Sequence, residues 1–159
     1  MATVTVITVG TLKESYLREA VAEYKKRLSQ YARVEEIELK EERISDEDNR
    51  SQISAALECE ADKILSAIPK GSIKIALCVE GKQYSSEELA NIIGEACDGC
   101  GRITLIIGSS WGLSERVKRE CDLRLSFSKL TFPHQLMKVI LLESVYRSFT
   151  ILRGKRYHK

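Results

Sequence analysis

The chain has 159 residues, of which 43% are hydrophobic and 30% charged, and its formal net charge is +2 at pH 7. This length and composition fit one domain, residues 1–159, that buries its own core without disulfides or metal. No apolar run approaches the roughly 20 residues of a membrane span, and no basic segment leads into an apolar one at the start. We therefore expect no membrane partner and a cytoplasmic location.

Five cysteines are scattered through otherwise apolar segments. The odd number favours a reducing compartment and free, mostly buried thiols over a disulfide framework. Cys97 and Cys100 form a C-x-x-C pair, but a zinc site would need two further ligands, and a redox motif would open a helix rather than close one. We expect a helix-terminal turn there and no metal site.

Segments with β-branched apolar runs alternate with segments of helical apolar spacing. In the first half they predict a strand at residues 4–9, a helix at 13–28, an edge strand at 34–39 and a helix at 45–68. In the second half they predict strands at 73–79, 103–107 and 123–126, with helices at 85–97, 114–120 and 134–152. This alternation indicates an α/β fold with a mainly parallel sheet and helices on both faces.

A polar loop, residues 126–134, separates the last strand from the last helix and ends in Pro133-His134. Proline suits the start of a helix because its missing N–H would be unpaired there anyway. Open α/β sheets bind ligands at the carboxyl ends of their strands, so Ser128, Thr131 and the loop amides are candidate ligand contacts. His134 fits either a structural role or a place in this site.

The turn Gly108-Ser109-Ser110-Trp111-Gly112-Leu113 follows another buried strand. Its glycines permit a close ligand approach or positive φ, although an ordinary tight loop has the same composition. The turn lacks the G-x-G-x-x-G spacing of a dinucleotide site and the Lys-Ser/Thr of a P-loop, which disfavours both classes.

The last helix is apolar around most of its circumference, so we expect a second copy of the chain to cover its spare face and form a homodimer. Glu143 and Arg147 lie four residues apart on it and can pair. Residues 129–159 carry seven Lys or Arg and one acid. This segment fits either a solvated basic tail or a surface that contacts phosphate.

Taken in order, several motifs resemble the small SPOUT-class (α/β-knot) methyltransferases of the ribosomal large-subunit methyltransferase H family, which modify ring nitrogen N3 of a pseudouridine in 23S rRNA. The motifs are Val9-Gly10, Gly108-x-x-x-Gly112-Leu113, Leu125-Ser126, Leu130-Thr131-Phe132-Pro133-His134, residues 139–143 with Tyr146-Arg147, and Tyr157-His158-Lys159. The likeness runs from end to end of the chain.

The resemblance implies a C-terminal deep trefoil knot, a homodimer with its active site at the subunit interface, S-adenosylmethionine as the methyl donor, and 23S rRNA within the assembled ribosome as the partner. Matching positions assign donor binding to Leu77, Gly108, Phe127, Ser128, Lys129, Leu130, Thr131 and Phe132. They assign the rRNA-facing and catalytic roles to His134, Glu143, Arg147, Tyr157, His158 and Lys159.

Methyl transfer to N3 needs a base or a stabilised anion, because that nitrogen carries a proton. Histidine titrates near neutral pH, so His134 and His158 are the candidate bases, while Arg147 and Lys138 could stabilise the anion or contact phosphate. Lys138 stands where the family usually has Arg, and Ser109 where it has a second glycine. Two alternatives remain open: a SPOUT methyltransferase acting on tRNA, and a non-catalytic dimeric ribosome-binding module.

Overall fold

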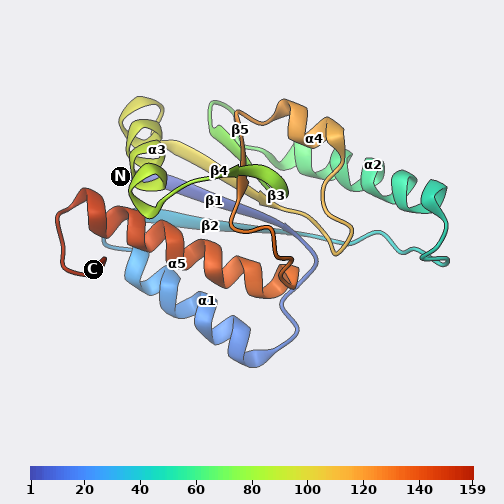
Figure 1. The fold of residues 1–159 in the computed structure, drawn as a ribbon, viewed down its shortest axis with the longest axis horizontal. Coiled ribbons are helices and arrows are strands. Elements are labelled where there is room, and N and C mark those ends of the chain that lie inside the picture. Colours follow the sequence, from blue (N-terminus) through green and yellow to red (C-terminus); the bar gives the residue numbers. More distant parts are fainter.

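A computed structural model describes residues 1–159 as one parallel five-stranded sheet with helices packed against it (Figure 1). The strands are β1 (Ala2–Val9), β2 (Ala32–Leu39), β3 (Ile73–Gln83), β4 (Arg102–Ile107) and β5 (Leu123–Ser126). The helices are α1 (Ser15–Leu28), α2 (Arg50–Ala67), α3 (Ser86–Gly99), α4 (Glu115–Glu120) and α5 (His134–Leu152). The strand order is β2-β1-β4-β3-β5, which confirms the α/β prediction and the edge position of the second strand.

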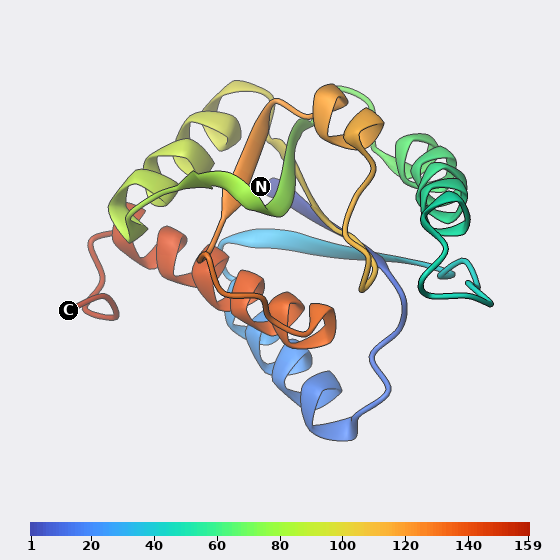
Figure 2. The same cartoon turned by 45° about the vertical axis from the view of Figure 1, so that its right-hand side comes forward.

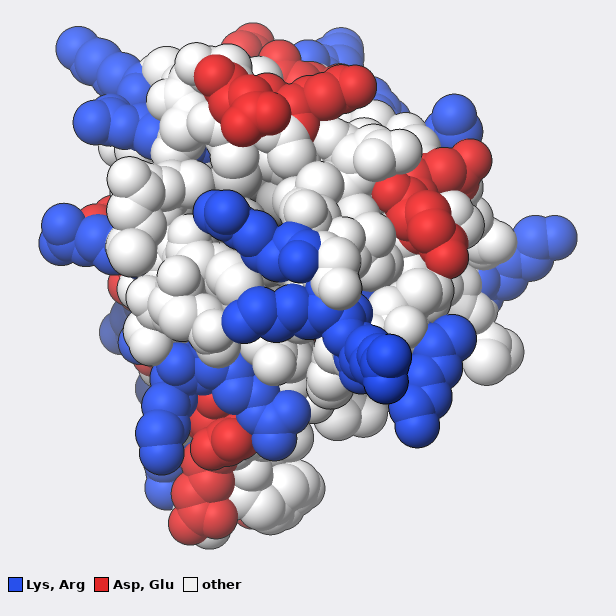
Figure 3. Space-filling view, turned by 90° about the vertical axis from the view of Figure 1, so that its left-hand side faces the viewer, with Lys and Arg blue, Asp and Glu red and all other residues white.

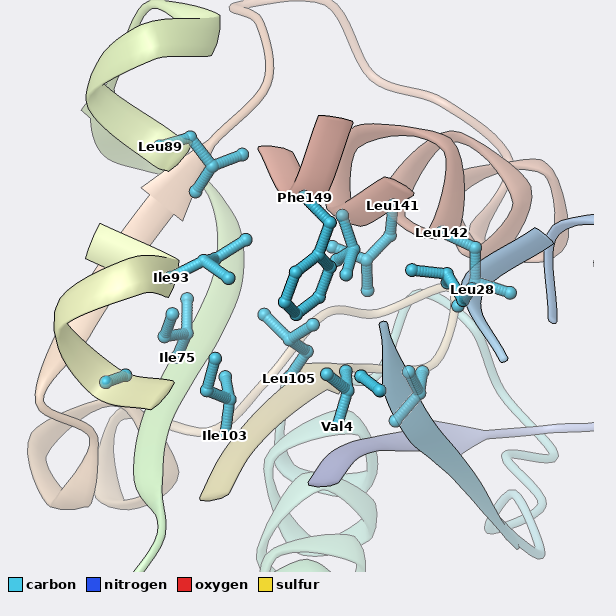
Figure 4. Packing of buried hydrophobic residues seen from close by; sticks show 14 of the residues in the cluster. Val4, Leu28, Ile75, Leu89, Ile93, Ile103, Leu105, Leu141, Leu142 and Phe149 are labelled. Atoms are coloured by element: carbon cyan, nitrogen blue, oxygen red, sulfur yellow. The ribbon is translucent and has the colours of Figure 1, made fainter. Parts of the chain in front are cut away.

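Alternate residues of the central strands feed two separate apolar layers, because successive side chains of a strand point to opposite faces. In β4, Ile103 and Leu105 join the larger cluster with α1, α3 and α5, whereas Ile106 joins the smaller cluster with α2 and α4. Figure 4 shows the larger layer, where Ile75, Ile103 and Leu105 of the sheet lie beneath Ile93 of α3 and Phe149 and Leu141 of α5. Helices therefore cover both faces, as predicted.

The second helix begins five residues later than predicted, at Arg50. Asn49 is its N-cap and accepts a hydrogen bond from the Gln52 N–H at 3.2 Å. The Gln52 side chain also accepts the N–H groups of Ser45 and Asp46, at 3.2 and 3.1 Å. These bonds hold residues 45–48 in a loop, because a capping asparagine and a side-chain acceptor compete with the helix for the same donors.

The third strand runs past its predicted end because it pairs with β5 twice. Leu77 and Lys82 both lie opposite Leu125, and the register shifts between them. Gly81 sits so close to β5 that an added Cβ would lie 2.8 Å from the backbone carbonyl of Arg124. Figure 2 shows the C-terminal part of β3, in green, crossing in front of β5, in orange. The predicted trefoil knot involves this part of the chain and stays a prediction.

The cysteines correct one expectation. All five are free thiols, but Cys59 and Cys100 are exposed and the other three are partly exposed, so the prediction of mostly buried thiols is wrong. Cys59 occupies the outward face of α2, and Cys100 is the C-cap of α3, where the predicted helix-terminal turn is found. Among the helices, none has both the length and the apolar character needed to cross a membrane.

Candidate functional site

The carboxyl ends of β3, β4 and β5 meet around a cavity of about 370 Å³. Its walls come from the end of β3, the turn after β4 and the loop between β5 and α5. This is the expected position for a ligand site in an open α/β sheet, and its size falls in the usual range for small-molecule pockets. Half of the 22 lining residues are hydrophobic.

The turn after β4 forms one wall, and only glycine fits its first position. A Cβ on Gly108 would lie 2.2 Å from the carbonyl oxygen of Gly112. Gly112 has a φ of +85° and donates its N–H to the Ser109 carbonyl at 2.9 Å. The turn is therefore folded back on itself, with its backbone close to the cavity.

The loop after β5 forms the opposite wall and is held by two serines. The Ser126 hydroxyl donates to the Ser128 carbonyl at 3.0 Å, and the Leu130 N–H donates to the Ser128 hydroxyl oxygen at 3.0 Å. Such local side-chain bonds fix a loop without regular structure. They leave Leu130 70% exposed and Phe132 36% exposed at the mouth of the cavity.

Most of the predicted donor-binding residues line this one cavity. Those that do are Leu77, Gly108, Phe127, Ser128, Leu130, Thr131 and Phe132. Lys129, assigned to the same role, does not line it and is exposed.

His134 also lines the cavity, at the first residue of α5. Its Nε2 atom lies 3.2 Å from the position that a Cβ on Gly10 would occupy, and a Glu41 carboxylate oxygen lies 3.8 Å from the same position. Gly10 has a φ of +102°, a conformation that favours glycine, and a side chain there would also crowd the imidazole. The first strand, the segment after β2 and α5 thus meet at His134.

An ion pair that sequence reasoning missed also lines the cavity. The Lys118 ammonium of α4 pairs with the Glu80 carboxylate of β3, and the Lys118 side chain is only 12% exposed. Burial opposes the charged form of Lys118, but the hydrogen bond to Glu80 outweighs it and raises the lysine pKa. Residues so distant in sequence gave no signal of this pairing.

Four of the predicted catalytic residues form a second cluster, around the C-terminal half of α5. The Glu143 carboxylate accepts bonds from Arg147 at 2.5 Å and from the Tyr157 hydroxyl at 3.1 Å. Arg147 lies 3.3 Å from Nδ1 of His158, whose Nε2 lies 2.8 Å from Glu87. The chain after α5 therefore folds back onto its own helix, while Lys159 is exposed at its end.

The electrostatics of this cluster keep the Tyr157 hydroxyl protonated. Burial and then the Glu143 carboxylate raise the pKa of Tyr157 to about 12. The hydrogen bond from Arg147 to Glu143 raises the pKa of the guanidinium, so Arg147 stays a cation. The cluster thus holds a protonated phenol, Tyr157, and a cation, Arg147, beside the imidazole of His158.

The two groups of predicted site residues are far apart within one chain. His134 and Arg147 are 13 positions apart on α5, which corresponds to about 20 Å along a helix. In Figure 1 the loop before α5 and the C-terminus lie at opposite ends of that helix. The single chain brings His134 to the cavity and leaves Glu143, Arg147, Tyr157 and His158 away from it.

The predicted phosphate contact of Lys138 is not supported, because its side chain faces inward. Lys138 is 1% exposed and its ammonium lies 2.7 Å from Glu36 and 3.4 Å from Glu38 of β2. Burial alone would raise the pKa of Glu36, but Lys138 and Lys25 outweigh it and lower that pKa. Lys138 ties α5 to the sheet edge, as a buried lysine must be paired.

Comparison with known sequences identifies a family match over nearly the whole chain. The family model described as "Predicted SPOUT methyltransferase" matches residues 2–158. A protein of Caldicellulosiruptor bescii named ribosomal RNA large subunit methyltransferase H is 51% identical over 154 residues, covering 97% of this chain and 98% of the relative. A protein of the same name from Streptococcus agalactiae is 46% identical over 155 residues, covering 97% and 98% of the two chains.

Solved structures share the fold at low sequence identity. A probable methylase family protein from Haemophilus influenzae superposes with a TM-score of 0.56 at 13% identity, covering 98% of this chain and 70% of the other. A probable methyltransferase from Bordetella pertussis gives 0.55 at 13% identity, with coverages of 92% and 95%. At this identity the likeness speaks for the fold alone.

Proposed function

This chain belongs to the SPOUT methyltransferase family, and we propose from this premise that it transfers a methyl group from S-adenosylmethionine to N3 of a pseudouridine in 23S rRNA, on the assembled ribosome in the cytoplasm. The observation that carries the proposal is the single cavity formed by three strand ends and walled by the Gly108 turn and residues 127–132. Relatives that match 97% of the chain bear the name ribosomal RNA large subunit methyltransferase H.

The cavity fits the proposed methyl donor in size and chemistry. The apolar side chains of Leu77, Phe127 and Leu130 would hold an adenine ring, and the backbone groups of the glycine turn and the loop would bind its polar edges. When bound, the donor supplies a methyl group activated on a positively charged sulfur. Gly108 has no side chain to fill the space where the backbone folds back, so the turn can border a ligand closely.

The protein's own part is to position the base and to take up its proton. Orientation of two reacting centres can lower a barrier by about 7–11 kcal/mol in well-oriented intramolecular model reactions. His134 is the histidine that lies at the cavity, so we assign its imidazole as the base that takes the proton from N3. Arg147, which stays a cation, would stabilise the resulting anion. It belongs to the cluster formed with Glu143, Tyr157 and His158 at the C-terminal half of α5.

A homodimer would bring these groups together. Since Arg147 lies about 20 Å from His134 in its own subunit, a partner subunit has to supply Arg147, Tyr157 and His158 to each cavity. Large apolar side chains that line the cavity are exposed in the single chain: Val79, Trp111, Leu130 and Phe132. Such a patch is typical of a surface that another protein chain covers.

Cations of the tail are available for rRNA phosphates. Arg153, Lys155, Arg156 and Lys159 are all exposed, and none of them lies in an ion pair. Figure 3 views the end of the molecule where both termini lie and shows Lys and Arg side chains across the middle of this face, with acidic side chains nearer its upper, right and lower edges. Phosphate contacts of this kind position a protein on RNA without reading its sequence.

Methyl transfer from labelled S-adenosylmethionine to intact ribosomes, free 23S rRNA and tRNA tests the proposal. We expect label on intact ribosomes only, and a nucleoside digest should place it on N3 of pseudouridine. Label on tRNA would favour a tRNA methyltransferase. Absence of any label, together with no heat of binding for the donor in calorimetry, would favour a non-catalytic ribosome-binding module.

A further inference from the structure

His158 connects two helices through its two ring nitrogens. Its Nε2 atom lies 2.8 Å from a carboxylate oxygen of Glu87, in the first turn of α3, and its Nδ1 atom lies 3.3 Å from the Arg147 guanidinium of α5. Glu87 and His158 are 71 positions apart, so only the fold brings them together. The proposed reaction gives Glu87 no role.

The two partners of His158 specify where its ring proton lies. A guanidinium only donates hydrogen bonds, so Nδ1 has to accept one from Arg147. An ionised carboxylate only accepts them, so Nε2 has to carry the proton that Glu87 accepts. One form of the imidazole satisfies both contacts: the neutral ring with its N–H on Nε2. In the other tautomer, and in the doubly protonated ring, an N–H on Nδ1 would face an N–H of Arg147.

The first turn of α3 holds Glu87 in a fixed place. The Ser85 hydroxyl oxygen accepts the Glu88 N–H at 3.1 Å, and the Glu88 carboxylate accepts the Ser85 N–H at 2.8 Å, which forms a capping box around Glu87. Further along α3, a Cβ on Gly94 would lie 3.0 Å from the side chain of Leu152 of α5. Figures 1 and 2 show the first turn of α3 beside the C-terminal end of α5. The carboxylate is therefore presented to the tail from a rigid helix.

The contact with His158 fixes the guanidinium at a second nitrogen. One terminal nitrogen of Arg147 bonds to Glu143 at 2.5 Å, and the other is the one that faces His158 Nδ1. The Arg147 guanidinium carbon also lies 4.8 Å from the centre of the Tyr157 ring. A guanidinium held at two nitrogens has one orientation, whereas one bound to Glu143 alone could turn about that bond.

We infer that Glu87 is a positioning residue for Arg147: by accepting the Nε2–H of His158, it keeps the Nδ1 lone pair directed at the guanidinium. The inference rests on the proposed function, because it takes Arg147 to stabilise the substrate anion. It also makes His158 an orienting link rather than a base, since the one lone pair of its ring is already bound to Arg147.

Three substitutions at position 87 separate the acceptor from its charge. Glu87→Gln keeps a carbonyl acceptor for the Nε2–H without the negative charge, whereas Glu87→Ala removes the acceptor. Glu87→Lys replaces it with a donor, which favours a lone pair on Nε2 and a proton on Nδ1. Glu95 is exposed on the same helix, so Glu95→Lys is the matched control for reversal of charge.

NMR of the histidine ring nitrogens measures the tautomer directly, above the pH range in which histidine ordinarily titrates. The chain has two histidines, so a His134→Gln variant assigns the signals of His158. The His158 proton should lie on Nε2 in the wild type, in Glu87→Gln and in Glu95→Lys. In Glu87→Lys it should move toward Nδ1. The Glu87 side chain is 61% exposed, so these variants should fold as the wild type does.

Methylation of intact ribosomes measures the consequence for Arg147. Glu87→Ala should lower kcat about fivefold and Glu87→Lys about tenfold, whereas Glu87→Gln and Glu95→Lys should stay within about twofold of the wild type. Affinity for S-adenosylmethionine in calorimetry should stay within about threefold in all four variants, because neither Glu87 nor Glu95 lines the cavity.

A wild-type ring with its proton on Nδ1 would overturn the inference. So would equal losses of kcat in Glu87→Gln and Glu87→Ala, unchanged kcat in Glu87→Lys, or a loss in Glu87→Lys without any change of tautomer. A wild-type protein that methylates no RNA would instead refute the proposed function, and the ring signals would still decide whether Glu87 sets the tautomer of His158.

Discussion

At the scale of single residues, His134 has the most direct chemical assignment. His134→Ala should lower methyl transfer by about a hundredfold or more, the usual contribution of a general base. Donor binding should stay close to wild type, because the imidazole contributes only one part of a wall formed by 22 residues. Single-turnover methylation of ribosomes and calorimetry with the donor measure the two effects separately, and a fully active variant would exclude His134 as the base.

Tyr157 gives a pH-dependent prediction. Its pKa is raised from an ordinary value near 10 to about 12 by burial and by Glu143. A group whose pKa is raised on folding stabilises the protein fully below the unfolded value and loses that contribution as the pH rises through the folded one. The wild type should therefore exceed Tyr157→Phe in free energy of unfolding by a constant amount below pH 10, and this difference should shrink between pH 10 and about 12.

Denaturant unfolding at several pH values, with wild type and Tyr157→Phe compared at each, isolates this phenol from the other titrating groups. The phenolate absorbance of Tyr157, obtained as the difference between the two proteins, should rise near pH 12. A transition near pH 10 would mean that the hydroxyl does not hold Glu143.

At the scale of elements, the crossing of β3 over β5 depends on Gly81. A Cβ there would lie 2.8 Å from the backbone of Arg124 and Leu125, which cannot yield as a flexible side chain could. Gly81→Ala should lower the free energy of unfolding by about 1–3 kcal/mol, the usual range for overpacking. Gly99→Ala, at the end of α3, is the control, because a Cβ there meets nothing within 4 Å. Similar unfolding midpoints for both variants would show that the crossing tolerates a side chain.

The elements that sequence reasoning located best are those specified by local signals. Ser85 and Glu88 form a capping box at the predicted start of α3, and the β-branched apolar run of residues 103–107 predicted β4. The predicted start of α2 was five residues early, because Asn49 caps the helix and the Gln52 side chain accepts the N–H groups of Ser45 and Asp46. The second pairing of β3 with β5 could not be predicted, since it depends on a partner strand 40 or more residues away.

Part of the candidate site could be predicted from the sequence and part could not. Its two loops could be predicted, because glycines follow one predicted strand and a polar segment ending in proline follows another, and the cavity lies between these loops. The pairs Lys118–Glu80 and Lys138–Glu36 were not visible, because a charged residue in a sequence carries no mark of whether it is buried or which distant carboxylate it meets. Lys138 was expected to stabilise an anion or contact phosphate, but its side chain is buried and paired with Glu36.

At the scale of the whole molecule, the proposed chemistry is split between two ends of one helix. His134 lies at the cavity with the apolar rim, and Arg147 lies with the basic tail. A symmetric dimer that places the tail of each subunit over the cavity of the other would create two complete sites from these parts. Each site would then take its base from one chain and its cation from the other.

Subunit complementation tests this division. His134→Ala and Arg147→Ala should each be inactive alone, because every site in either homodimer lacks one group. After mixing and subunit exchange, half of the dimers pair one variant with the other, and in each of these one of the two sites combines an intact His134 with an intact Arg147. Activity should therefore recover to about one quarter of the wild-type value, given random exchange in a two-fold symmetric dimer. A site built within one subunit would carry a defect in every dimer, so no recovery after confirmed exchange would exclude the shared site.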